Sequence, residues 1–197
     1  MPLASLTIHA EDPLLHLPLS SVMRSASVLL RVLGFSLLLV EGIQLTTRTA
    51  LPVSAADAHT FLATPSNWPS IVASSRSVKS DTHPISMPMG VGDTIDEVFG
   101  LPPIIPLQVR WKCEVSDAAN GELAFFSPEG LRNIAKDCRM IFLIKDRKGA
   151  ENSCFVDFTM EYDPVSPIAF FATPVLELDN ALAINVLLPK AIRSSIS

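Results

Sequence analysis

Basic residues are scarce in this chain and are not gathered in one place. Its 197 residues include 15 Lys and Arg against 20 Asp and Glu, which gives a net charge of −5 at neutral pH. Binding to nucleic acid by neutralising phosphates needs a basic stripe. The densest basic stretches, at residues 132–139 and 145–148, are interleaved with acidic residues. We therefore expect no nucleic-acid partner.

Cysteine is also rare, and its spacing excludes two common uses. Cys113, Cys138 and Cys154 show no CxxC or Cys/His spacing of the kind that binds zinc. An odd number argues against a framework of disulfides. Each cysteine lies within an apolar alternation, where a free thiol behaves as a small hydrophobic group. This usage favours a reducing, intracellular compartment, although the sequence does not identify the organelle.

Recognisable catalytic motifs are missing as well. No GxSxG, HExxH, P-loop or GxGxxG pattern occurs. Beyond residue 42 the only histidines are His59, expected on the solvent side of a helix, and His83, expected in a proline-rich loop. The carboxylate pair Asp157/Glu161 falls on the expected outer face of a strand, and Asp96-Glu97 is a second pair of carboxylates. We therefore predict no catalytic residue, no metal and no cofactor.

The first 41 residues differ from the rest and leave three interpretations open. Residues 28–40 read VLLRVLGFSLLLV, an apolar run that Arg31 interrupts. A targeting segment fits the nine-residue run 32–40, but no small-x-small cleavage site follows it. A transmembrane helix would need about 20 apolar residues, and the uncharged run at 32–40 is well short of that length. The third interpretation is an extension that packs on the domain, and residues 25–40 are also a candidate for membrane contact.

After residue 42 the pattern predicts a strand, two short helical segments, several strands and one long helix. Ser54 is a predicted N-cap for the first helix, and the pair Trp68-Pro69 lies in a short helical turn. Pro174 and Pro189 interrupt the last helix, and we expect a kink or a fresh start at Thr173-Pro174. The expected strands cover residues 44–51, 74–82, 93–99, 105–115, 122–127, 137–145 and 154–162, and the expected helices cover 55–62 and 168–193.

The strand at residues 105–115 carries the clearest signal. Six apolar or aromatic residues from Ile105 to Val115 alternate with Gln, Arg, Lys and Glu, a period of two that is typical of a half-buried strand. The strand at 154–162 shows the same alternation. In the last helix Leu178, Leu182, Val186 and Pro189 form one stripe, which we expect to face the sheet.

Four stretches resemble a known superfamily: LPVSAADAHTFLATPSNWPSIV at 51–72, MGVGDTIDEVFG at 89–100, VRWKCEVSD at 109–117 and FVDFTMEYDP at 155–164. They resemble the START-like, or SRPBCC, superfamily of polyketide cyclase/dehydrase-like proteins, lipid-transfer domains and the birch pollen allergen fold. The resemblance spans residues 42–193, and the prolines at 102, 103 and 106 depart from it. It implies an α+β helix-grip fold: a curved antiparallel sheet of six or seven strands around a long C-terminal helix, with an apolar cavity between them.

The resemblance gives two domains, an extension at 1–41 and a ligand-binding domain at 42–197. It also implies that inward-facing side chains form the cavity wall, although the same side chains would pack an ordinary core. Three functions stay open: a carrier of a lipid, polyketide or isoprenoid-like molecule, a cyclase-like enzyme, and an interaction module without a cavity. The candidate wall residues are Trp68, Trp111, Phe126 (or its neighbour Phe125), Phe142, Phe158, Tyr162, Leu178 and Leu182. Tyr162, Arg110 and Arg139 are candidates for polar contacts with a ligand.

Overall fold

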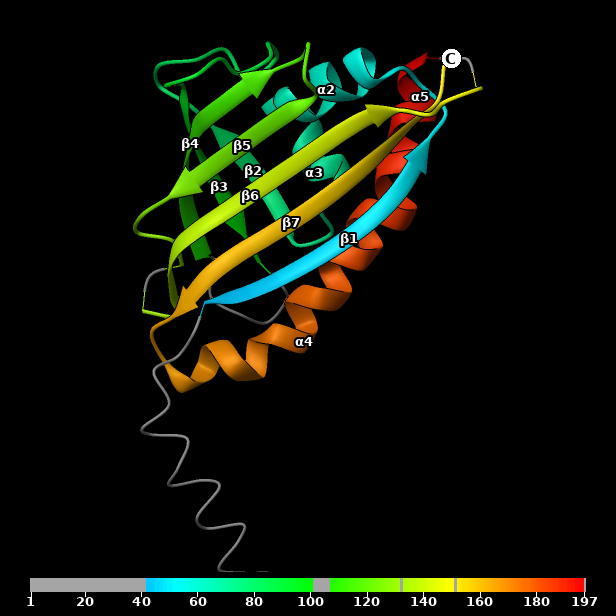
Figure 1. Ribbon diagram of the computed structural model, residues 1–197. Helices are drawn as coiled ribbons and strands as arrows, with labels where there is room; N and C mark the ends of the chain where they lie inside the picture. The colour runs from blue at the N-terminus through cyan, green and yellow to red at the C-terminus, as the bar shows by residue number, and fades with distance from the viewer. Residues whose placement is uncertain (1–41, 101–106, 132, 151, 197) are drawn as a thin grey trace, which may run out of the picture. The chain divides into compact units, whose positions relative to one another are not determined.

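A computed structural model of the chain describes residues 42–100, 107–131, 133–150 and 152–196 (Figure 1). The three interpretations of residues 1–41 lie outside the described residues. Among the residues that are described, no helix is both long enough and apolar enough to cross a membrane.

Seven antiparallel strands form one curved sheet, which confirms the predicted fold class (Figure 1). The strand order is β1-β7-β6-β5-β4-β3-β2. From β7 down to β3, each strand pairs with the strand that precedes it in the sequence. Pairing of β1 with β7 brings the first strand beside the last. The strands are β1 (Ile43–Leu51), β2 (Ser75–Lys79), β3 (Thr94–Phe99), β4 (Leu107–Asp117), β5 (Glu122–Ser127), β6 (Ala135–Asp146) and β7 (Cys154–Pro164).

Two short helices follow β1, as predicted. Helix α2 (Ala55–Ala63) begins at the predicted N-cap, where the Ser54 hydroxyl accepts a hydrogen bond from the Asp57 backbone N–H. A 3-10 turn, η1 (Pro65–Asn67), leads into the four-residue helix α3 (Trp68–Ile71). Trp68 is buried, and its indole N–H donates to the Leu62 carbonyl at 2.8 Å. This bond fixes the turn to helix α2.

The long helix begins within one residue of the predicted position. Helix α4 (Pro167–Leu182) starts with proline at its first position and continues through Pro174. Of the two alternatives predicted at Thr173-Pro174, a kink or a fresh start, the fresh start is therefore wrong. An internal proline costs a helix about 3 kcal/mol. Packing of buried residues on both sides of it, such as Ala169 and Ala183, outweighs that cost. A π-helical turn, η2 (Ala183–Leu187), then joins α4 to α5 (Leu188–Ile196), close to the interruption predicted at Pro189.

The apolar stripe of the long helix that was predicted to face the sheet is mostly exposed instead, so this prediction is wrong. Leu178, Leu182 and Val186 are 70%, 39% and 53% exposed. The buried positions are instead Ala169, Ala183, Ile184, Leu188 and Ile192. The helix carries apolar residues on most of its own faces, so the periodicity of its sequence does not identify the face that packs on the sheet. The π-helical turn, which holds more than 3.6 residues, also shifts the phase of any stripe drawn across it.

The inner face of the sheet carries the core. In β4, Val109, Trp111 and Cys113 are buried while the polar residues between them are exposed, which confirms the predicted alternation for the described part of that strand. Phe158 in β7 is buried too. All three cysteines are buried and unpaired, and burial raises the pKa of each thiol to about 11. They therefore act as hydrophobic core residues.

Candidate ligand-binding cavity

A cavity of about 420 Å³ lies between the inner face of the sheet and helix α4. Figure 1 shows α4 and α5 crossing one side of the curved sheet, with α2 and α3 on that side as well. Strands β3, β4, β6 and β7 supply one wall, and α3, α4 and η2 supply the other. Most of the lining side chains are aliphatic or aromatic, as is usual for a site that binds small molecules.

Four of the predicted wall residues line this cavity: Trp68, Trp111, Phe142 and Phe158. The rings of Phe142 and Phe158 contact one another in a tilted arrangement, with their centroids 4.9 Å apart and an angle of 39° between their planes. All four are at most 7% exposed. Whether they contact a ligand stays a prediction.

Three other residues predicted to form the cavity wall, Phe126, Leu178 and Leu182, do not line the cavity. Phe126 lies on the outer face of β5, where the guanidinium of Arg139 sits 4.7 Å from its ring. Its neighbour Phe125 is the buried one and packs edge-to-face on Trp68. Two adjacent aromatics cannot both face inward, because successive side chains in a strand point to opposite faces. Leu178 and Leu182 are exposed and do not line the cavity.

The candidate polar contacts also point elsewhere. Tyr162 is buried, but its hydroxyl lies 2.9 Å from that of Thr173, and it does not line the cavity. Because the Thr173 hydroxyl donates to the Ala169 carbonyl, Tyr162 is the donor between the two hydroxyls. The bond is structural: it joins β7 to α4. Arg110 and Arg139 both lie on the outer face of the sheet.

Sequence reasoning missed the main polar group of the cavity, Glu97. This side chain is 1% exposed and lines the cavity from β3. The indole N–H of Trp111 donates to its Oε2 at 3.0 Å. Its other oxygen, Oε1, has no hydrogen-bond partner among the described residues, and neither has the nearby hydroxyl of Ser75. A buried acceptor without a donor is costly and calls for an explanation.

Burial raises the pKa of Glu97 to about 7, well above its ordinary value of 4.5. The polar groups of Ser75 and Trp111 favour the charged form and partly offset this effect, whereas the negative charge of Asp179 adds to it. Near neutral pH the carboxyl group therefore exists in both protonation states. Such a group can accept or donate a proton.

Asp179 is the second acidic residue of the wall. It is half-buried on α4, and the Ser74 hydroxyl donates to its Oδ2 at 2.6 Å. Next to it, the Asn180 amide lies 3.6 Å from the sulfur of Met160. Among the described residues that line the cavity, none is Lys, Arg or His. The only charged groups that these residues bring to the cavity are thus Glu97 and Asp179.

The alternation of β3 places Asp96 and Glu97 on opposite faces of the sheet. Asp96 points outward and forms two hydrogen bonds of 2.8 Å with Arg110, as expected of a carboxylate on a solvated sheet surface. Ile95 is buried, so the residue two positions later, Glu97, belongs to the same inner face. That spacing was the available signal. It does not reveal that a cavity lies in front of the carboxyl group.

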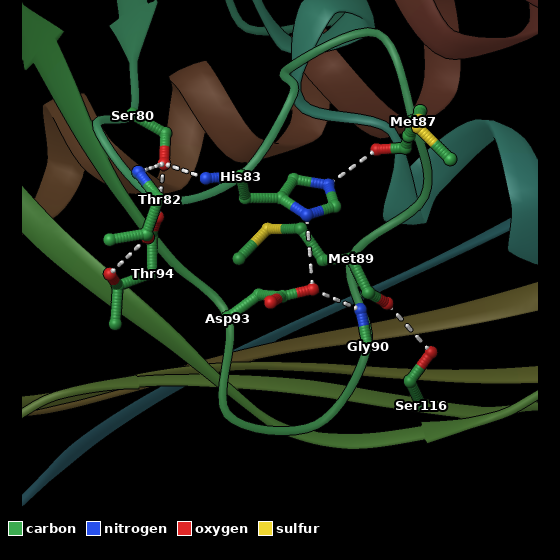
Figure 2. Close-up of polar contacts among 9 residues, drawn as sticks. All are labelled: Ser80, Thr82, His83, Met87, Met89, Gly90, Asp93, Thr94 and Ser116. Atoms are coloured by element: carbon green, nitrogen blue, oxygen red, sulfur yellow. Dashed lines mark hydrogen bonds and ion pairs between the residues drawn. The ribbon is translucent and has the colours of Figure 1, made fainter.

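The two histidines of the domain do not line the cavity. His59 is 5% exposed, so the prediction that it faces solvent is wrong: helix α2 turns this side toward β5, and Nε2 lies 3.3 Å from the Glu122 carbonyl. His83 braces the proline-rich loop (Figure 2). Its Nε2 lies 2.9 Å from the Met87 carbonyl and its Nδ1 3.1 Å from Asp93, whose carboxylate also accepts from the Gly90 N–H.

Comparison with known proteins identifies the fold. No protein-family model matches the sequence, and no curated protein is significantly similar to it. Solved structures do match. A protein from Thermus thermophilus has a TM-score of 0.61 at 13% identity, over 79% of this chain and 100% of that one.

One plant enzyme and one bacterial enzyme match over a similar range. Norcoclaurine synthase from Thalictrum flavum has a TM-score of 0.59 at 16% identity, over 80% of this chain and 98% of the enzyme. The ZhuI aromatase/cyclase from Streptomyces sp. R1128 has a TM-score of 0.60 at 13% identity, over 79% of this chain and 96% of the enzyme. At these identities the likeness concerns architecture. The chain shares the helix-grip fold of these structures.

Proposed function

We propose that this protein binds a small, mainly apolar molecule in the cavity between its sheet and helix α4. The observation that carries the proposal is a cavity of about 420 Å³ with a wall of mostly aliphatic and aromatic side chains. Burial of apolar ligand surface contributes roughly 25 cal/mol per Å². The aromatic rings of Trp68, Trp111, Phe142 and Phe158 would supply much of the contact area.

The cavity also argues against an interaction module whose interior is filled by its own side chains. The described residues leave open space in front of Glu97, although large residues such as Trp111 surround it. The structural neighbours are consistent with ligand binding. The norcoclaurine synthase structure contains a transition-state analogue, and the Streptomyces protein is an aromatase/cyclase.

A second candidate function is catalysis by proton transfer, and a specific observation favours it. Glu97 has a pKa near neutrality, one unpartnered oxygen and a position on the cavity wall. General acid–base catalysis needs a group whose pKa lies near the working pH and which reaches the bound molecule. In this hypothesis Glu97 exchanges a proton with the ligand. Binding is common to both functions and is tested first.

The test of binding is native mass spectrometry of the full chain, purified without detergent, followed by extraction of any molecule that co-purifies. Binding of N-phenyl-1-naphthylamine, a neutral dye whose fluorescence rises in apolar surroundings, is measured in parallel. We expect a stoichiometric adduct or saturable dye binding. Absence of both would contradict the proposal.

A cavity-filling variant locates the bound molecule. Ala172 lies on α4 at the cavity wall, so Ala172→Phe places a ring in the cavity and should weaken dye binding about tenfold or more. Ala56→Phe adds the same ring at an exposed position of α2 and serves as the matched control. Equal dye affinity in both variants would place the bound dye outside the cavity.

A further inference from the structure

We propose that the molecule bound in this cavity is a hydrophobic amine, whose protonated nitrogen binds to the acidic part of the wall formed by Glu97 and Asp179. The inference rests on the proposed ligand-binding function and narrows it to one chemical class. It follows from three observations: the sign of the charges in the wall, an unpartnered oxygen, and the positions of the two carboxyl groups.

The charged side chains that the described residues bring to the wall are all of one sign. Glu97 and Asp179 line the cavity, and none of its described lining residues is basic. An anionic ligand such as a fatty acid would therefore place a third negative charge beside these two carboxyl groups, in an apolar space where no described lining residue offers a cation, which is strongly unfavourable. A cationic ligand would instead neutralise the charges already present.

One oxygen of Glu97 lacks a charged donor. Trp111 donates to Oε2, whereas Oε1 is buried and forms no hydrogen bond with a described residue, and the nearby Ser75 hydroxyl is a neutral group that leaves the charge of the carboxylate unpaired. A carboxylate accepts hydrogen bonds and donates none. The missing partner is thus a donor, and an ammonium group offers up to three N–H bonds together with the opposite charge. Charge-assisted bonds of this kind are roughly twice as strong as neutral ones.

Asp179 lines the same cavity as Glu97. Its negative charge raises the pKa of the Glu97 carboxyl group. Asp179 is held in place by the Ser74 hydroxyl and is half-buried. Two neighbouring carboxylates repel one another unless a cation or a proton lies between them. A protonated amine would relieve this repulsion.

The test compares three ligands that share one ring system and differ in charge: 2-naphthylmethylamine, 2-naphthylmethanol and 2-naphthoate. Each displaces the neutral dye N-phenyl-1-naphthylamine from the full-length protein at pH 8. We expect the amine to bind about tenfold more tightly than the alcohol, and the carboxylate to bind more weakly than either. Equal affinities for the amine and the alcohol, or tightest binding of the carboxylate, would overturn the inference.

Two variants assign the preference to its residues. Glu97→Gln keeps the size and the acceptor for Trp111 but removes the charge, so the amine should lose its advantage while the alcohol still binds. Asp179→Asn should reduce the advantage by a smaller factor. Glu114→Gln, an equal charge change on the exposed face of β4, should leave the order unchanged.

The outcomes separate this inference from the proposed function. If the dye and all three naphthalenes fail to bind, ligand binding itself is contradicted, and the amine inference with it. If the dye and the alcohol bind without any preference for the amine, the cavity stands and only the choice of ligand class is wrong. Because the order of the three ligands is measured on the wild type, a variant that fails to fold does not leave the inference undecided.

Discussion

The two faces of the sheet shift the pKa of a carboxyl group in opposite directions. On β3, Asp96 faces solvent and pairs with Arg110, which holds the pKa of its carboxyl group below the ordinary value. The next residue, Glu97, faces the cavity, where burial raises its pKa to about 7. The chemical groups are alike, and a single step along the strand separates them. What differs is the access of water and the presence of a cation.

The comparison indicates where the protein gives up stability. An exposed carboxylate with an arginine partner is an ordinary feature of a sheet surface. A carboxyl group at 1% exposure with one unpartnered oxygen opposes folding, and a leucine of similar size would avoid that penalty. A cost of this kind is typical of a functional site. This is why we assign Glu97, and not Asp96, to the site.

The largest expected difference between the two faces concerns the adjacent rings of β5. Phe125 is fully buried against Trp68, so Phe125→Ala should lower the free energy of unfolding by about 3–5 kcal/mol. Phe126 stacks with Arg139 on the outer face, so Phe126→Ala should lower it by about 1 kcal/mol or less. Urea denaturation measures both values. Similar losses in the two variants would contradict the assignment of faces.

The next effect is the pH dependence of stability that Glu97 introduces. Its pKa rises from 4.5 in the unfolded chain to about 7 in the folded protein, so between these values the folded state binds more protons. The contribution of Glu97 to the free energy of unfolding therefore falls as the pH rises from about 4.5 to about 7, by about 3 kcal/mol, and is constant above that range.

A charge-removing variant isolates this contribution from the other titrating groups. Glu97→Gln should be more stable than the wild type above pH 7, and its advantage should shrink toward zero as the pH approaches 4.5. Glu114→Gln, on the exposed face of β4, is the matched control and should follow the wild type throughout. A constant difference between Glu97→Gln and the wild type from pH 4.5 to 8 would show that Glu97 has an ordinary pKa.

Local alternation made much of the fold predictable from the sequence. In β4 the polar and apolar residues change places at every step, because one face is packed and the other is solvated. The cap at Ser54 and the buried turn at Trp68 were predictable for the same reason: each depends on neighbours a few residues away. Four of the wall residues followed from these patterns.

What could not be predicted depends on contacts between distant segments. Helix α4 is apolar on several sides, so the face that packs on the sheet is decided by the shape of the space it fills, and Leu178 ended up exposed. The partner of Tyr162 lies on another element, at Thr173. Glu97 could have been placed on the inner face from its spacing to Ile95. Its lack of a hydrogen-bond donor is visible only in three dimensions.

The most direct test of this account is a carbon NMR titration that follows the side-chain carboxyl signals of Asp96 and Glu97 in the same sample. Single Asn and Gln variants assign the two signals. We predict a midpoint near pH 7 for Glu97 and a midpoint below 3.8 for Asp96. Midpoints near the ordinary values of 4.5 for Glu97 and 3.8 for Asp96 would contradict the buried carboxyl group on which the proposed site depends.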